Sequence, residues 1–175
     1  MKLRKLFVLV CLAALLPAVS FADTPRESDA KVDAALDRFH REVKGADQLL
    51  ADAKAVLVLP EVVKGGLIVG GAYGRGTVFE QGAFLGYSDI TQATVGLQAG
   101  GQSFAELVVF ETRTDLNRFT AGKLALAANI SAVILKSGAA DSARYTDGVA
   151  VFVEPIGGAM VEAAIGGQQF TFDPK

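Results

Sequence analysis

Apolar residues recur at intervals of three and four near the start of the chain, from Val32 to Leu50. This spacing places them on one side of an amphipathic helix, which we predict over about residues 29–53 with Ser28 or Asp29 as its N-cap. The other positions alternate in the sign of their charge, which is typical of a solvated helix face. A helix dedicated to a membrane surface carries a more basic polar face. We therefore expect the apolar stripe to pack against the rest of the domain.

After residue 54 the pattern changes to apolar runs and to a period of two, which are typical of strands. Residues 55–59 form an apolar run that ends at Pro60. Between Leu67 and Phe79 the odd positions are mostly bulky, and the small even positions are Gly70, Ala72, Gly74 and Gly76. Because successive strand residues face opposite sides, one face of this strand can fill a core, and the other lets backbone, a helix or a ligand approach closely.

Further strand patterns follow, with glycine pairs between them. We expect strands at residues 92–99, 104–111, 123–135, 149–154, 159–165 and 169–172. Hairpin turns favour glycine because they tolerate or require positive φ, so we expect turns at Gly100-Gly101, Gly157-Gly158 and Gly166-Gly167. A short helix is predicted over residues 115–119, with Thr114 as its cap.

One helix followed by many closely spaced strands predicts an α+β fold. We expect an antiparallel β-sheet folded into a barrel or sandwich, with the N-terminal amphipathic helix packed on it. The predicted strands are too short and uneven for an outer-membrane barrel, which needs longer strands with an outward apolar band. The sequence has no internal linker and no repeat of fixed period, so residues 29–175 are expected to form a single domain.

The N-terminus has the residue order of a secretory signal peptide. Basic residues precede an apolar run over residues 6–16, and Ser20 and Ala22 supply small side chains before Asp23. The run is shorter than the ~20 residues that a transmembrane helix needs. We therefore expect residues 1–22 to be a signal peptide and residues 23–28 a polar leader. The exported protein is then periplasmic or associated with the outer membrane.

A second interpretation makes Cys11 a lipoprotein cysteine that tethers the protein through an acyl chain. Val10 stands before it, where a small residue is needed, so we favour the ordinary signal peptide. Cys11 is the only cysteine of the chain. Its removal excludes disulfides, thiolate catalysis and a cysteine-ligated zinc site from the exported protein.

Size and charge narrow the possible partners. Removal of 22 of the 175 residues leaves 153, an ordinary size for one domain. Three of the 17 basic residues leave with the signal peptide, so 14 remain against 19 acidic residues and the net charge becomes about −5. This balance disfavours nucleic acid, which is bound largely through its phosphates. It also disfavours adhesion to anionic lipid by charge alone.

No pattern in the sequence predicts an active site, a metal site or a cofactor site. The single histidine, His40, lies in the predicted helix and is expected at the surface. The carboxylates on predicted strands are expected to face outward: Glu106, Glu111, Glu154 and Glu162. The glycine-rich run over residues 70–76 lacks the spacing of a phosphate-binding loop and the helix that must follow one. We therefore expect a protein that is not an enzyme and needs no cofactor.

Several segments resemble, in order, the motifs of one family, the SYLF domains. Residues 55–76, AVLVLPEVVKGGLIVGGAYGRG, resemble the opening motif of that family. Residues 86–88 fall where the family has an aromatic-serine step, and residues 96–102, GLQAGGQ, resemble its G-x-Q-x-G segment. Residues 157–162 lie where it has a late glycine-containing strand, although EPIGG at residues 154–158 departs from the usual lysine-glycine-leucine. The resemblance covers roughly residues 50–172.

The resemblance implies a lipid-binding domain. Eukaryotic members are associated with phosphoinositides and actin, and neither is expected outside a bacterial cytoplasm, so only general lipid binding transfers. The resemblance also implies that Lys64 and Arg75 lie near a lipid head group, with Tyr73 and Tyr87 as amphipathic neighbours. The motif glycines and glutamines are Gly66, Gly70, Gly71, Gly74, Gly76, Gly96, Gln98, Gly100 and Gln102.

Alternatives remain for these residues and for the function. Lys64 follows a predicted strand end, where solvent can surround it, and Arg75 can pair with Glu80. The expected function is a phospholipid-binding module at the bacterial cell envelope. The alternative is an envelope domain that binds a protein partner, or serves a structural role, without a lipid ligand.

Overall fold

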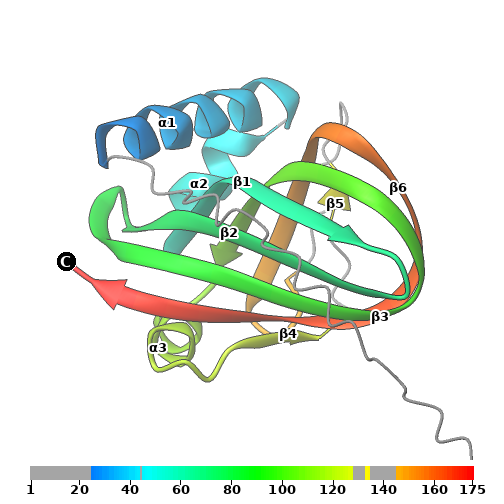
Figure 1. Ribbon diagram of the computed structural model, residues 1–175. Helices are drawn as coiled ribbons and strands as arrows, with labels where there is room; N and C mark the ends of the chain where they lie inside the picture. Colours follow the sequence, from blue (N-terminus) through cyan, green and yellow to red (C-terminus); the bar gives the residue numbers. More distant parts are fainter. Residues whose placement is uncertain (1–24, 44, 128–132, 135–144) are drawn as a thin grey trace, which may run out of the picture.

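The computed structural model describes residues 25–43, 45–127, 133–134 and 145–175. The predicted signal peptide, and residues 128–132 and 135 of the strand predicted at residues 123–135, lie outside these residues. The described chain forms helices α1 (Pro25–Glu42), α2 (Ala46–Asp52) and α3 (Arg113–Thr120) and strands β1 (Ala55–Gly66), β2 (Val69–Glu80), β3 (Ala83–Phe110), β4 (Ala125–Ala127), β5 (Val133–Ile134) and β6 (Val149–Pro174). Figure 1 shows them as one rolled sheet with helices at one end.

The predicted α+β fold is confirmed, and the sheet is curled into a half-barrel. Its strands follow the order β1-β2-β3-β6-β4, with β1 also paired to β3. All pairs are antiparallel except the short parallel pair of β5 and β6. Strands β3 and β6, of 28 and 26 residues, pair along nearly their whole length and bend together at the right of Figure 1. We call the concave side of the sheet its inner face and the convex side its outer face.

The prediction of hairpin turns at the glycine pairs is wrong. Gly100 and Gly101 lie inside β3, and the two later pairs lie inside β6. Their glycines serve the bend of the sheet, because strands this long must curve to enclose a core. Gly158 has φ 85°, and a Cβ there would lie 2.3 Å from the Gly101 carbonyl oxygen. The bend therefore requires glycine where the sequence suggested a turn.

The prediction that Pro60 ends the first strand is wrong. Strand β1 passes through Pro60 and continues to Gly66. The register of β1 slips on both of its sides at this point, between Val58 and Glu61 toward β2 and between Leu59 and Val62 toward β3. Proline has no N–H to give to a neighbouring strand, so a bulge is where a sheet accommodates it. The bulge therefore allows β1 to continue past Pro60 as a single strand.

The predicted N-terminal helix is divided into α1 and α2. Gly45, with φ 84°, separates them in the left-handed region that glycine adopts without strain. α1 packs on the outer face of the sheet, as expected from its apolar stripe. The cluster beneath it joins α1 and α2 to β1, β3 and β6 through buried Val32, Ala35, Phe39, Val43, Ala46, Ala53, Val58, Leu107, Val109, Ala150 and Phe152.

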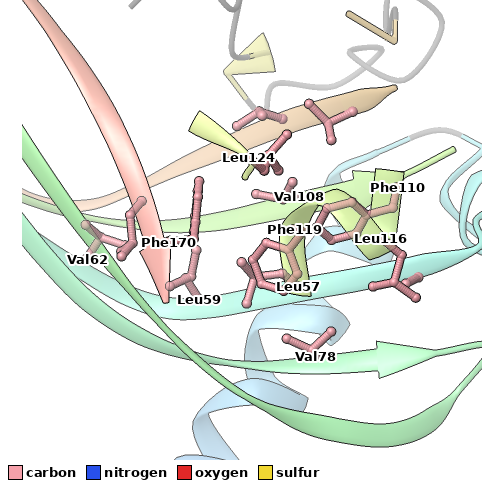
Figure 2. Close-up of a cluster of buried hydrophobic side chains, with 14 of the residues drawn as sticks. Leu57, Leu59, Val62, Val78, Val108, Phe110, Leu116, Phe119, Leu124 and Phe170 are labelled. Carbon is pink, nitrogen blue, oxygen red and sulfur yellow. The ribbon is translucent and has the colours of Figure 1, made fainter. Parts of the chain in front are cut away.

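A second cluster fills the inner face, where α3 closes one end of the half-barrel (Figure 2). Phe119 of α3 lies with its ring 5.1 Å from that of Phe110 and 5.9 Å from that of Phe170. The short helix is confirmed, but its cap is Thr112 and not Thr114. The Thr112 hydroxyl accepts from the Asp115 N–H at 3.3 Å, and the Asp115 carboxylate accepts from the Thr112 N–H at 3.2 Å.

Strand β2 presents its small residues to the inner face and its bulky residues to the outside. Ala72, Gly74 and Gly76 are buried, whereas Val69 and Tyr73 are exposed. A Cβ at Gly76 would lie 2.3 Å from the Val58 carbonyl oxygen, next to the bulge of β1. The small face therefore admits the backbone of a neighbouring strand. On the bulky face, Val69 and Tyr73 do not fill a core, whereas Phe79 at the far end of the strand packs against the cluster beneath α1.

Candidate functional site

Three of the four predicted lipid-binding residues meet on the outer face, around Asp89. The Tyr73 hydroxyl donates to Asp89 Oδ1 at 3.2 Å, and Arg75 Nε lies 3.1 Å from the same oxygen. The Arg75 guanidinium also lies 5.9 Å from the centre of the Tyr87 ring. The alternative pairing of Arg75 with Glu80 is wrong, since Glu80 pairs with Lys54 and Arg113.

The titration of Tyr73 reflects this arrangement. Partial burial raises the pKa of the Tyr73 hydroxyl, and the neighbouring Asp89 carboxylate raises it further by its charge and by the hydrogen bond. The positive charge of Arg75 opposes this rise. The phenol therefore stays a neutral hydrogen-bond donor at physiological pH.

Lys64, the fourth predicted residue, lies on the opposite face of the sheet. Its side chain is buried, with 7% of the residue exposed, so solvent does not surround it. Its strand neighbours are Ala72 of β2 and Gln102 of β3. The bulge at Pro60 decides this orientation, because a slip of one residue exchanges the two faces of a strand. Lys64 therefore does not share a surface with Arg75.

The motif glutamine Gln98 has a structural role beside the motif glycines. The Thr94 hydroxyl donates to its side-chain oxygen at 2.8 Å, and its amide nitrogen donates to the Ile68 carbonyl at 3.4 Å. A Cβ at Gly70 would lie 2.5 Å from that same side-chain oxygen. Glycine at this position thus leaves room for the buried amide that ties the β1–β2 hairpin to β3.

Other motif glycines lie where β1, β2 and β3 pair side by side next to the hairpin. Gly66 pairs with Gly70 in β2 and with Gly100 in β3. A Cβ at Gly66 would lie 2.5 Å from the Gly70 Cα. Gly96 also belongs to this region, and its N–H donates to the Ile68 carbonyl at 2.9 Å. Most of these motif residues therefore build the hairpin end of the sheet.

The hairpin end carries an exposed group of aliphatic side chains, which sequence reasoning did not single out. We call it the apolar end, and its members are Leu67, Ile68, Val69, Val95 and Leu97, each 63–79% exposed. They are contiguous, because Val69 pairs with Val95 and the Leu67 carbonyl accepts from the Gln98 N–H at 3.0 Å. Residues 62–74 and 90–104 contain one charged residue, Lys64, and it is buried. Exposed apolar groups of this kind mark interaction surfaces.

Glu106 is a buried acid that the sequence analysis placed on the outside, and that prediction is wrong. It lies on the inner face with 2% of its surface exposed. Burial raises the pKa of its carboxyl to about 7, against the opposing effect of a hydrogen bond from the Gln168 amide to Oε2 at 3.1 Å. Its Oε1 has no hydrogen-bond partner within the described chain.

The remaining titratable residues named from the sequence are His40, Glu111, Glu154 and Glu162. His40 is exposed, as predicted, and its Nε2 lies 3.4 Å from Asp47. Glu111 is exposed, and Glu154 faces α1, where it pairs with Arg38 at 2.8 Å. The side chain of Glu162 lies outside the described residues. No group of three or more His, Cys, Asp or Glu side chains suited to a metal ion occurs in the part of the chain that the structure describes.

Comparison of the chain with models of known protein families and with curated proteins gives no match. Among the described residues, no helix is both long and apolar enough to cross a membrane.

Proposed function

We propose that this protein is a phospholipid-binding module of the bacterial cell envelope, acting without catalysis. The observation that carries the proposal is the apolar end, where five neighbouring aliphatic side chains are left in solvent without a charged residue among them. Burial of such side chains in the acyl region of a membrane surface removes apolar surface from water. The free energy of binding becomes more favourable by roughly 25 cal/mol for each Å² of apolar surface buried. The resemblance to SYLF domains supports the same conclusion.

The charge of the chain supports an apolar mode of binding. With a net charge of about −5 after loss of the predicted signal peptide, the protein has no general attraction to anionic lipid. Binding through the apolar end should therefore persist at high salt, which screens only charges. The predicted signal peptide brings the protein to the periplasmic side of the envelope, where phospholipid surfaces are available.

The chain offers a clean fluorescence test because it contains no tryptophan. The full chain, purified from a bacterial host as that host processes it, carries Leu97→Trp in one variant and Ala34→Trp in another. Ala34 is an exposed residue of α1. Vesicles of phosphatidylethanolamine, phosphatidylglycerol and cardiolipin should shift the Leu97→Trp emission to the blue, at low and high salt, and lipids brominated on the acyl chain should quench it. The Ala34→Trp emission should not change.

A charge at the apolar end should weaken binding strongly. Leu97→Glu should weaken co-sedimentation with these vesicles at least about tenfold, because a carboxylate is costly to bring into an apolar layer. Ala34→Glu adds the same charge at the other end and should bind like the parent chain. If the parent chain ignores every vesicle, lipid binding is rejected, and specific capture of one envelope protein would then favour the protein-interaction alternative.

A further inference from the structure

The outer face of the sheet changes in composition row by row away from the apolar end. Val69 and Val95 form one row across β2 and β3, and the next row on this face, Gly65, Gly71 and Ala93, holds only glycine and alanine. A row of Val63, Tyr73 and Thr91 follows, in which polar groups first occur. The sequence of rows is thus aliphatic, small, and then amphipathic.

Charges occur at the next row and mark a sharp boundary. Glu61 pairs in register with Arg75, and Arg75 pairs in register with Asp89, so that three charged residues cross β1, β2 and β3 side by side. We call these three residues the charged row. Along β2 it lies six residues from Val69, which is about 20 Å of extended strand. An inclined strand brings this length close to the ~15 Å depth of one hydrocarbon leaflet.

We propose that the charged row, with Tyr73, is a head-group site that prefers a zwitterionic phospholipid bearing a primary amine. This inference rests on the proposed function. The order of the rows matches the order met on entering a bilayer, where aliphatic side chains take the core, tyrosine takes the interface and charges take the head-group layer. A protein partner would impose no such gradient.

The groups of the site match the two charges of such a head group. Arg75 uses Nε for Asp89 and its side chain remains 57% exposed, so its terminal nitrogens can donate to a phosphate in the bidentate manner of guanidinium. The contacts of Asp89 with Tyr73 and Arg75 both use Oδ1. Its Oδ2 is thus placed to accept from a primary ammonium, with the exposed Glu61 carboxylate on the other side of Arg75.

The balance of charge in the row sets the selectivity. Two carboxylates flank one guanidinium, so the row carries a net negative charge and repels a head group that has a phosphate alone. A quaternary ammonium cannot donate a hydrogen bond to Asp89, and the Tyr87 ring, which could attract it, already faces Arg75. Ethanolamine head groups should therefore be preferred to both choline and glycerol head groups.

The test compares vesicles of phosphatidylcholine alone with vesicles that also contain phosphatidylethanolamine or phosphatidylglycerol, using the full chain as its host processes it. Phosphatidylethanolamine should strengthen co-sedimentation about three- to fivefold, the size expected for one exposed ionic contact. Phosphatidylglycerol should not. Asp89→Asn should remove the gain from phosphatidylethanolamine and create one for phosphatidylglycerol, because Arg75 then loses its ion pair and the row loses its net negative charge. Arg75→Gln should weaken binding to all three vesicles.

Matched controls carry the same charge changes at the helical end. Asp147→Asn removes an ion pair with Arg118, and Arg113→Gln removes one with Glu80 at the end of β2 far from the apolar end, so both should keep the parent selectivity. Vesicle binding without a preference for phosphatidylethanolamine would overturn the head-group site and leave the proposed function intact. Retention of that preference in Asp89→Asn would also overturn it. Failure of the parent chain to bind any vesicle would instead reject the proposed function.

Discussion

The two ends of β1 carry similar aliphatic side chains on the outer face and place them in opposite environments. Val58, beneath α1, is 2% exposed, whereas Val63, five residues along the same strand, is 53% exposed. One end is a core that an amphipathic helix covers, and the other end is bare within the described chain (Figure 1). The apolar residues on the outer face of this sheet therefore fall into two groups, one buried and one exposed. Those beneath α1 hold the fold together, and those at the apolar end are available for binding.

The largest expected difference between the ends is in stability. Phe152, whose ring lies 5.2 Å from that of Phe39, is fully buried beneath α1, so Phe152→Ala should lower the free energy of unfolding by ~3–5 kcal/mol. Leu97→Ala at the apolar end should change it by less than ~0.5 kcal/mol. Urea unfolding followed by circular dichroism measures both variants. Equal losses would show that the apolar end is a hidden part of the core.

Two glycines with nearly the same positive φ separate the ends in another way. Gly45 and Gly158 have φ of 84° and 85°, but a Cβ at Gly45 meets no atom within 4 Å, while a Cβ at Gly158 would collide with the Gly101 carbonyl. Gly45→Ala should cost ~1 kcal/mol for the left-handed conformation alone. Gly158→Ala should cost ~3 kcal/mol or more, because a steric clash is added. Thermal unfolding of the pair tests whether the bend of the sheet depends on close backbone approach.

Glu106 extends the comparison to the inner face. Its folded pKa of about 7 lies above its ordinary value of 4.5, so the folded state favours the protonated acid. The stability from this preference is present below pH 4.5 and is lost as the pH rises through about 7. A shift of this size corresponds to ~3 kcal/mol. The free-energy difference between the parent chain and Glu106→Gln, measured by urea unfolding at pH 4 to 8, should change by up to that amount.

Gln168→Leu supplies the control for this pH profile. Removal of the amide deletes the hydrogen bond that opposes the rise in the Glu106 pKa, so the fall in stability should move to higher pH. A difference between the parent chain and Glu106→Gln that stays constant over this pH range would contradict the assignment.

The smallest expected difference concerns the ion pairs of the two ends. Arg38 and Glu154 join α1 to β6 at 2.8 Å with side chains 32% and 19% exposed, so Glu154→Gln should lower stability by up to ~1 kcal/mol. Asp89→Asn breaks the more exposed pair with Arg75 and should leave stability unchanged within ~0.5 kcal/mol. A larger loss from Asp89→Asn in urea unfolding would assign Asp89 to folding and not to binding.

Local patterns predicted much of the fold and part of the site. The spacing of apolar residues identified the helix that covers the sheet, and the strand signals placed β2 and the start of β1 closely. Residues 104–110 show why burial was harder to predict. Both their odd and their even positions are apolar except Glu106, and both faces are in fact covered, one by α1 and one by the inner core. No alternation was left to show that Glu106 points inward.

The sequence by itself determined that this is an α+β domain with a packing helix, since those properties follow from periodicities within a few residues. Only the tertiary structure decided that glycine pairs bend long strands, because turns and bends use the same residue for the same conformational freedom. It also decided, through the bulge at Pro60, that Lys64 faces inward and Val63 outward. The apolar end likewise depends on contacts between distant strands. Exposure is a property of the assembled surface, and no single segment contains it.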